Sequence, residues 1–67
     1  MMRTNHVKEI REARGLSQRQ LAEKLHIAQS LLCDIERGTR DPWPKVRRRL
    51  ARIFKVSESE LFPPETN

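Results

Sequence analysis

Apolar residues recur at helical spacing in short segments along this chain of 67 residues, and this pattern constrains its fold more than any other feature. No stretch alternates apolar and polar residues for long enough to suggest a strand. Glycine, proline and capping residues separate the segments. Helices are expected at about residues 5–14, 17–25, 28–37, 44–54 and 57–62. The sequence therefore predicts an all-α domain of five short helices.

Several local signals set the ends of these helices. Ser17-Gln18-Arg19-Gln20 and Ser57-Glu58-Ser59-Glu60 both read as capping boxes, in which the serine hydroxyl and the fourth side chain satisfy exposed backbone N–H groups. Gly15 and Gly38 follow helical segments, where a left-handed residue commonly ends a helix. Pro44 is tolerable only in the first turn of the fourth segment.

The length and composition argue against an enzyme. A chain this short buries roughly 60% of its unfolded surface, so its core is thin and a deep substrate cavity is not expected. We find no nucleophile–base pair, metal cluster or phosphate loop in the sequence, and we expect no catalytic site, no cofactor and no metal. His6 and His26 lie far apart with no cysteine pair. The single cysteine, Cys33, cannot form an internal disulfide, which fits a reducing compartment.

The chain shows no signal for a membrane or for export. No apolar run approaches the roughly 20 residues needed to span a bilayer. The first six residues, 1–6, have no apolar core of the signal-peptide kind. We therefore expect a soluble protein of the cytoplasm.

Positive charge is concentrated in one part of the chain. The formal net charge is +5, but residues 37–55 alone carry +7, while residues 1–36 carry +1 and residues 56–67 carry −3. Such a concentration is expected of a protein that binds a polyanion. A solvated basic face explains the charge equally well, so charge alone does not decide between the two.

The second and third segments are joined by only a few residues around His26-Ile27, which gives either a plain helical hairpin or a helix-turn-helix. The third segment helps to separate these readings. Its apolar side carries Ala28, Leu32 and Ile35, with Leu31 at the border. Its other side carries Gln29, Ser30, Cys33 and Arg37, flanked by Asp34. Short polar side chains such as glutamine and serine can read base edges, which favours the helix-turn-helix.

Two stretches in particular carry a resemblance to a known family, namely Ser17 through Leu25 and Ile35-Glu36-Arg37-Gly38 with Pro42. Through them the sequence resembles the Cro/C1-type (XRE-like) helix-turn-helix family of phage repressors and bacterial regulators. The similarity continues through Leu50-Ala51 and residues 54–57 to Leu61-Phe62. It covers about residues 5–62 and implies a compact lambda-repressor-like domain. The whole chain, 1–67, would be one such domain, with the helix-turn-helix at about 17–37 and a flexible tail at 63–67.

The resemblance also implies roles for single residues. Gln18 matches the family glutamine that touches the DNA backbone and braces the first recognition residue. Arg11 and Glu36 match a partly buried ion pair. The remaining positions that match DNA-contacting ones are Gln29, Ser30, Cys33 and Asp34 on the recognition helix, and Arg37, Thr39 and Arg40 in the following loop. To these we add Lys45, as a phosphate contact at the start of the fourth segment.

The sequence departs from the family at several positions. Ala28 stands where the family prefers a serine or threonine cap, so the third helix begins less firmly, at a cost of about 1 kcal/mol. His26 and Lys55 occupy positions usually held by glycine. If their backbone is left-handed, each carries a strain of order 1–2 kcal/mol. Leu31, Cys33 and Asp34 are unusual on a recognition helix and leave the target sequence open.

The function that the resemblance implies is transcriptional regulation, most often repression, through a homodimer on a near-palindromic DNA operator. It also implies a bacterial or phage origin. An antitoxin, which uses the same fold to bind DNA and a protein partner, is the second hypothesis, and a pure protein–protein adaptor the third. Trp43 is expected to pack at the head of the fourth helix or to contact a second subunit. Helix five, Leu61-Phe62 and the Trp43 region are the candidate dimer surfaces.

Overall fold

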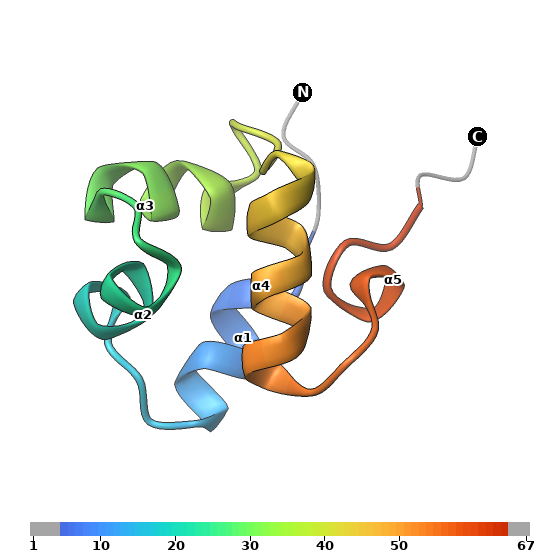
Figure 1. The fold of residues 1–67 in the computed structure, drawn as a ribbon, viewed down its shortest axis with the longest axis horizontal. Helices are drawn as coiled ribbons and strands as arrows, with labels where there is room; N and C mark the ends of the chain where they lie inside the picture. The colour runs from blue at the N-terminus through green and yellow to red at the C-terminus, as the bar shows by residue number, and fades with distance from the viewer. Residues whose placement is uncertain (1–4, 65–67) are drawn as a thin grey trace.

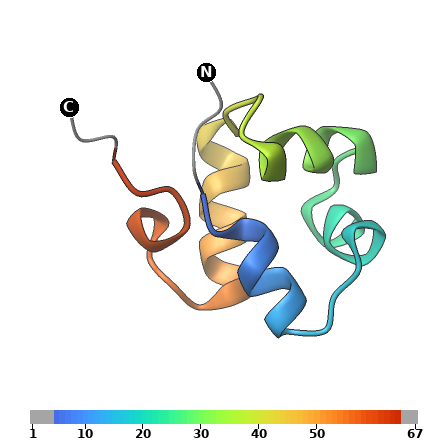
Figure 2. The same cartoon turned by 180° about the vertical axis from the view of Figure 1, so that it is seen from behind.

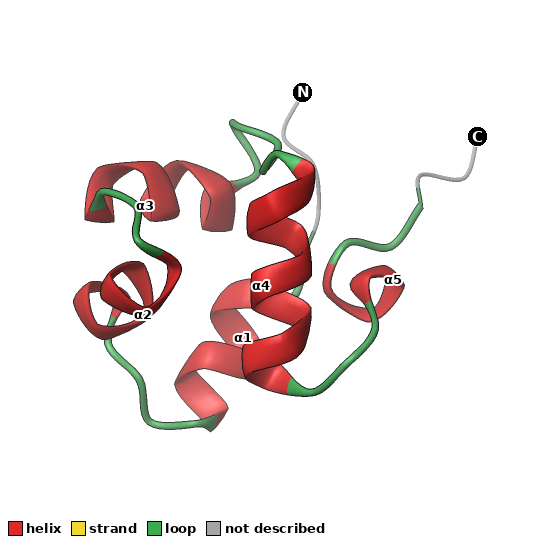
Figure 3. Cartoon of the chain, in the orientation of Figure 1, coloured by secondary structure: helices red, strands yellow, loops and turns green. Residues whose placement is uncertain are grey.

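The computed structural model describes residues 5–64 and confirms the all-α prediction. Its helices are α1 (Val7–Ala13), α2 (Gln18–Leu25), α3 (Gln29–Arg37), α4 (Pro44–Phe54) and α5 (Glu58–Leu61). The described residues contain no strand (Figure 3). The expected helices agree with these bounds to within one or two residues at each end. Pro63 and Pro64 follow α5 as exposed, non-helical residues, and the rest of the expected tail lies outside the described residues.

Helix α4 stands at the centre of the molecule, and the other helices surround it (Figure 1). Helix α3 lies across the N-terminal end of α4, with α2 beside it, and α5 packs on the opposite side of α4. The reverse view shows α1 covering the back of α4 (Figure 2). This arrangement leaves one long side of α3 at the edge of the molecule.

One hydrophobic core joins all five helices. Leu32 and Ile35 of α3 are fully buried, as the helical periodicity predicted. The core consists of Val7, Leu21, Ala22, Leu25, Leu32, Ile35, Val46, Leu50, Phe54 and Leu61. Ala28 was predicted on the buried side of α3, and that prediction is wrong because Ala28 is exposed. It is the N-cap of α3, and its extended backbone (φ −68°, ψ 146°) takes it out of the helical periodicity.

Helices α1 to α4 all end in the same way, with a left-handed residue that closes the last turn. These residues are Gly15, His26, Gly38 and Lys55, with φ of 69°, 59°, 80° and 57°. In each case the next N–H donates to the carbonyl five residues back, as in a Schellman motif. Both glycine predictions are therefore confirmed. His26 and Lys55 adopt the conformation that disfavours a side chain, so the expected strain is present at both positions.

The helix starts differ in how well they are capped. Ser17 forms the complete capping box with Gln20, as predicted. At α5 the Ser57 hydroxyl accepts a hydrogen bond from the Glu60 N–H and contacts the Ser59 hydroxyl. Ala28 makes no side-chain cap for α3, in agreement with the departure seen in the sequence. Helix α3 therefore begins without a side-chain cap.

Side chains from distant parts of the chain donate to carbonyls at three helix C-termini. Asn5 Nδ2 donates to the Ile35 carbonyl of α3 at 2.8 Å, and Asn5 Oδ1 accepts from the Val7 N–H at the start of α1. Arg14 Nη2 donates to the carbonyl of Phe54 in α4 at 2.6 Å. Arg49 Nη1 donates to the Leu25 carbonyl of α2 at 3.1 Å. The Ile35 carbonyl also accepts from the Gly38 N–H at 3.1 Å, so Asn5 adds a second donor there. Arg14 and Arg49 reach last-turn carbonyls, which have no partner within their own helix, and sequence analysis did not predict these bonds.

Candidate nucleic-acid interface

The outward side of α3 carries the side chains that the sequence predicted there. Gln29 and Ser30, in its first turn, are exposed. Arg37, at its last turn, is also exposed. Cys33 is a half-buried free thiol, and Asp34 is half-buried as well. The outward side of α3 thus has exposed polar side chains at its start and an exposed cation at its end. Cys33 and Asp34, in the middle of this side, are less accessible.

A buried ion pair links α3 to α1. Glu36 Oε2 accepts a hydrogen bond from Arg11 Nε at 2.7 Å, and Glu36 Oε1 accepts one from Arg11 Nη2 at 3.3 Å. The side chains are 9% exposed for Arg11 and 2% exposed for Glu36. Arg11 also donates from Nη1 to the Leu16 carbonyl at 2.8 Å. One guanidinium therefore ties α1, the turn before α2, and α3 into a rigid unit.

Gln18 belongs to the same network. Its Nε2 donates to Glu36 Oε1 at 3.0 Å, so one of its N–H groups points to the interior. The structure thereby links the first residue of α2 to the last turn of α3. The predicted contact of Gln18 with a DNA backbone stays a prediction, and the bond to Glu36 would orient the carboxamide for it.

The loop after α3 is closed onto the helix. The Thr39 N–H and the Thr39 hydroxyl both donate to the Asp34 carbonyl, at 3.0 and 3.1 Å. Arg40 follows as an exposed residue. The Thr39 hydroxyl donates its hydrogen to α3, so towards a ligand it can act only as an acceptor. The Arg40 guanidinium is the charged donor that this loop can present to a ligand.

The structure divides the basic stretch into structural and free cations. Arg47 Nε lies 3.4 Å from Glu58 Oε1, and the Arg47 guanidinium stacks 4.9 Å from the centre of the Phe62 ring, so this residue holds α5. Arg49 is engaged with α2, as described above. Lys45, in the first turn of α4, is exposed. Two arginines of this stretch, Arg47 and Arg49, therefore have structural partners within the protein.

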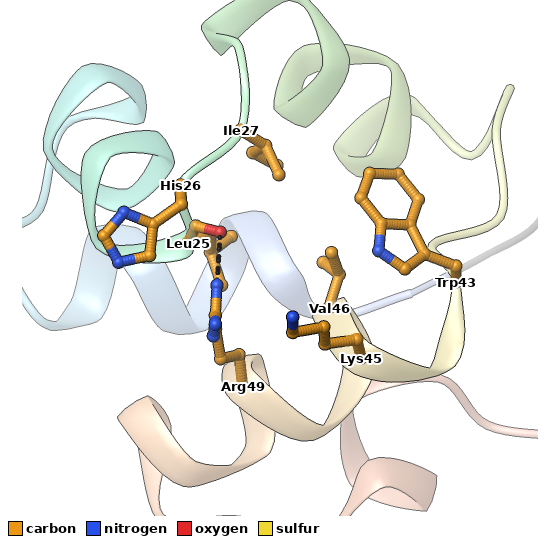
Figure 4. Close-up of a pocket in the computed structure, with 7 residues that line it drawn as sticks. All are labelled: Leu25, His26, Ile27, Trp43, Lys45, Val46 and Arg49. Atoms are coloured by element: carbon orange, nitrogen blue, oxygen red, sulfur yellow. Dashed lines mark hydrogen bonds between the residues drawn. The ribbon is translucent and has the colours of Figure 1, made fainter.

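Trp43 is the N-cap of α4 and is 43% exposed. Its ring lies at the edge of a shallow hollow between the α2–α3 turn and the head of α4 (Figure 4). Packing at the head of α4, one of the two roles expected for Trp43, therefore covers only part of the Trp43 side chain.

Within residues 5–64 no group of three or more histidine, cysteine, aspartate or glutamate residues is arranged to hold a metal ion. None of the helices in the same range is long and apolar enough to cross a membrane.

Two helices packed across a tight turn, with the second presenting exposed polar residues from its first turn, define a helix-turn-helix domain. The family model described as Helix-turn-helix matches residues 7–61, and the chain belongs to this family. Its type is the Cro/C1 (XRE-like) one that the sequence motifs predicted.

Two similar sequences and a similar solved structure agree with this assignment. The chain is 36% identical over 59 residues to the uncharacterized HTH-type transcriptional regulator YazB of Bacillus subtilis, covering 88% of this chain and 86% of YazB. It is 33% identical over 58 residues to the uncharacterized HTH-type transcriptional regulator MJ0272 of Methanocaldococcus jannaschii, covering 87% and 88% of the two chains. A similar crystal structure is the restriction-modification controller protein C.AhdI from Aeromonas hydrophila, with a TM-score of 0.76, 33% identity, and coverage of 85% and 86%.

Proposed function

We propose that this protein is a sequence-specific DNA-binding regulator of transcription, a repressor that acts in the cytoplasm and not an enzyme. The observation that carries the proposal is the exposed pair Gln29 and Ser30 in the first turn of α3. In a helix-turn-helix the first turn of the second helix meets the base edges of the major groove. Glutamine can make a bidentate contact to adenine, and serine can contact either kind of base edge. The relatives described as transcriptional regulators support the same function.

In this proposal the neighbouring cations and polar groups set the register on the DNA backbone. Arg37, Thr39 and Arg40 lie at the C-terminal end of α3, and Lys45 lies at the start of α4. They would contact phosphates without reading sequence. Gln18, oriented by Glu36, would also contact the backbone.

We further propose that the protein binds as a homodimer with two-fold symmetry. One α3 contacts few base pairs, so a single module discriminates poorly between sequences. Two modules on a near-palindromic operator would place the half-sites about 34 Å apart, which is one turn of DNA.

The test is selection of bound sequences from a random duplex pool, followed by measurement of affinity and stoichiometry on the selected site. We expect enrichment of an inverted repeat with half-sites one helical turn apart, and two chains bound per site. Affinity should fall steeply with added salt, because each phosphate contact releases a counterion. Failure to enrich any sequence would refute specific DNA binding, and enrichment of a single half-site bound by one chain would refute the homodimer.

A further inference from the structure

A hollow opens on the surface between the turn that joins α2 to α3 and the first turns of α4 (Figure 4). Its volume is about 310 Å³, at the small end of the range for ligand pockets and comparable to the space filled by a few side chains. The residues that line it are Leu25, His26, Ile27, Trp43, Lys45, Val46 and Arg49.

The ionisable side chains that line this hollow are all basic. Lys45 and Arg49 stand along one side of it, and His26 stands at its rim (Figure 4). None of the described residues that line the hollow is acidic. Arg49 uses Nη1 for the Leu25 carbonyl, and a guanidinium has further N–H groups that can donate to a carboxylate. The hollow is therefore complementary in charge to an acidic ligand.

The rest of the hollow is apolar. The indole ring of Trp43 faces the hollow together with the side chains of Ile27 and Val46 (Figure 4). Trp43 is the one exposed large hydrophobic residue among residues 5–64. Tryptophan and arginine, which both line this hollow, are enriched among the residues that contribute most to the affinity of protein–protein interfaces.

We propose that this hollow binds an acidic segment of a partner protein. One apolar side chain of the segment would pack against Trp43, Ile27 and Val46. Carboxylates on either side of it would pair with Lys45 and Arg49. Lys45 is shared with the proposed phosphate contacts, whereas Trp43, Ile27, Val46 and Arg49 are not, so the inference does not rest on the proposed DNA contacts.

The chemistry of the hollow favours a peptide over a DNA backbone. Phosphates would satisfy Lys45 and Arg49, but they would leave the faces of Trp43 and Ile27 in contact with water. An acidic segment with an apolar residue covers both sides of the hollow at once. A second copy of this chain fits less well if it meets the hollow with the same face, because Lys45 and Arg49 would then face their own counterparts.

The test uses the fact that Trp43 is the only tryptophan in the sequence, so its fluorescence reports on the hollow in the unaltered protein. The probes are short peptides with acidic residues on both sides of one central leucine or phenylalanine. Each is compared with a peptide whose acids are replaced by glutamine and with one whose central residue is alanine. We expect saturable binding of the acidic apolar peptide with a blue shift of the Trp43 emission. Both comparison peptides should bind at least about tenfold more weakly.

Variants separate the proposal from its competitors, with binding followed by anisotropy of labelled peptides. Trp43→Ala should weaken the acidic peptide about tenfold or more, Trp43→Phe should restore most of the affinity, and Arg52→Gln, a matched loss of charge outside the hollow, should change little. Trp43→Ala should leave the affinity for duplex DNA and the oligomeric state unchanged.

Three outcomes would overturn the proposal. The first is that no acidic peptide binds more tightly than its glutamine counterpart. The second is that Trp43→Ala weakens duplex DNA binding as much as peptide binding, which would make the hollow a DNA contact. The third is that Trp43→Ala converts a dimer to monomers, which would make it the interface between two copies. None of these outcomes bears on whether α3 reads DNA, so the proposed function is tested separately.

Discussion

The carboxylate of Glu36 accepts hydrogen bonds from Arg11 at 2.7 and 3.3 Å, although the two residues are 25 positions apart in the chain. Both side chains are nearly excluded from water. A buried charge is tolerable only while its partner is present, because the carboxylate would otherwise lose its solvation without compensation. The hydrogen bonds from Nε and Nη2 of Arg11 therefore help to fix the position of α3 relative to α1.

Arg11→Ala should lower the free energy of unfolding by roughly 3–5 kcal/mol, because it leaves Glu36 buried without a counter-charge. That is a large part of the roughly 3–10 kcal/mol expected of a domain of this length. The measurement is urea or thermal unfolding followed by circular dichroism. Arg19→Ala is the matched control, since Arg19 pairs with Glu23 at the surface, and its removal should change stability by less than about 1 kcal/mol. Equal losses in the two variants would contradict a buried role for Arg11.

His26→Gly and Lys55→Gly should each stabilise the protein by about 1 kcal/mol. Both residues have a left-handed backbone, φ 59° and 57°, which costs an L-residue roughly 1–2 kcal/mol. Glycine removes this strain, but its greater freedom in the unfolded chain offsets part of the stabilisation. Unfolding midpoints measure the effect. Gly15→Ala is the reverse control: an added Cβ would meet no atom within 4 Å, so a loss of stability there would be purely conformational. Unchanged or lower midpoints for both glycine variants would contradict the strain.

Ala28→Ser should stabilise the protein by about 0.5–1 kcal/mol. Ala28 has the backbone of an N-cap, and a serine hydroxyl there could accept a hydrogen bond from the first turn of α3. Ser17→Ala, which removes an existing cap from α2, should cost a similar amount. Amide hydrogen exchange in the first turn of α3 should slow in Ala28→Ser. Faster exchange there would show that the serine does not cap the helix.

Gln29→Ala should weaken binding to the selected operator by about 1–3 kcal/mol and relax the preference at one base position in each half-site. The physical reason is the loss of a side chain that can pair with a single base edge. Repeating the selection with the variant measures the change in preference. If the selected sequence stays the same, Gln29 does not read a base.

Arg40→Ala should weaken binding to all DNA sequences alike and reduce the slope of log affinity against log salt by about 1. Arg40 is exposed in the loop after α3 and would act through a phosphate. Arg52→Ala, on α4, is the matched control because it removes the same charge from a solvated face. A salt slope that falls equally in both variants would mean that Arg40 contributes only to the overall charge.

Local physics made much of the fold predictable. The periodicity of Leu32 and Ile35 identified the buried side of α3, and Gly38 identified the end of that helix, because both signals act within a few residues. Gln29 and Ser30 were expected to be exposed on the same argument, and they are. The Arg11–Glu36 pair was expected only from resemblance to a family, since no local rule joins residues so far apart.

The approximate ends of the helices and, apart from Ala28, their apolar sides followed from the amino-acid sequence, because backbone hydrogen bonding and side-chain periodicity are short-range. The roles of the charged residues depend on how the helices pack. Eight lysines and arginines in residues 37–55 look alike in the sequence. In the folded chain Arg47 holds α5 and Arg49 caps α2, while Lys45 remains at the surface. The difference arises because a long flexible side chain takes its partner from whatever the packing of distant helices brings within reach.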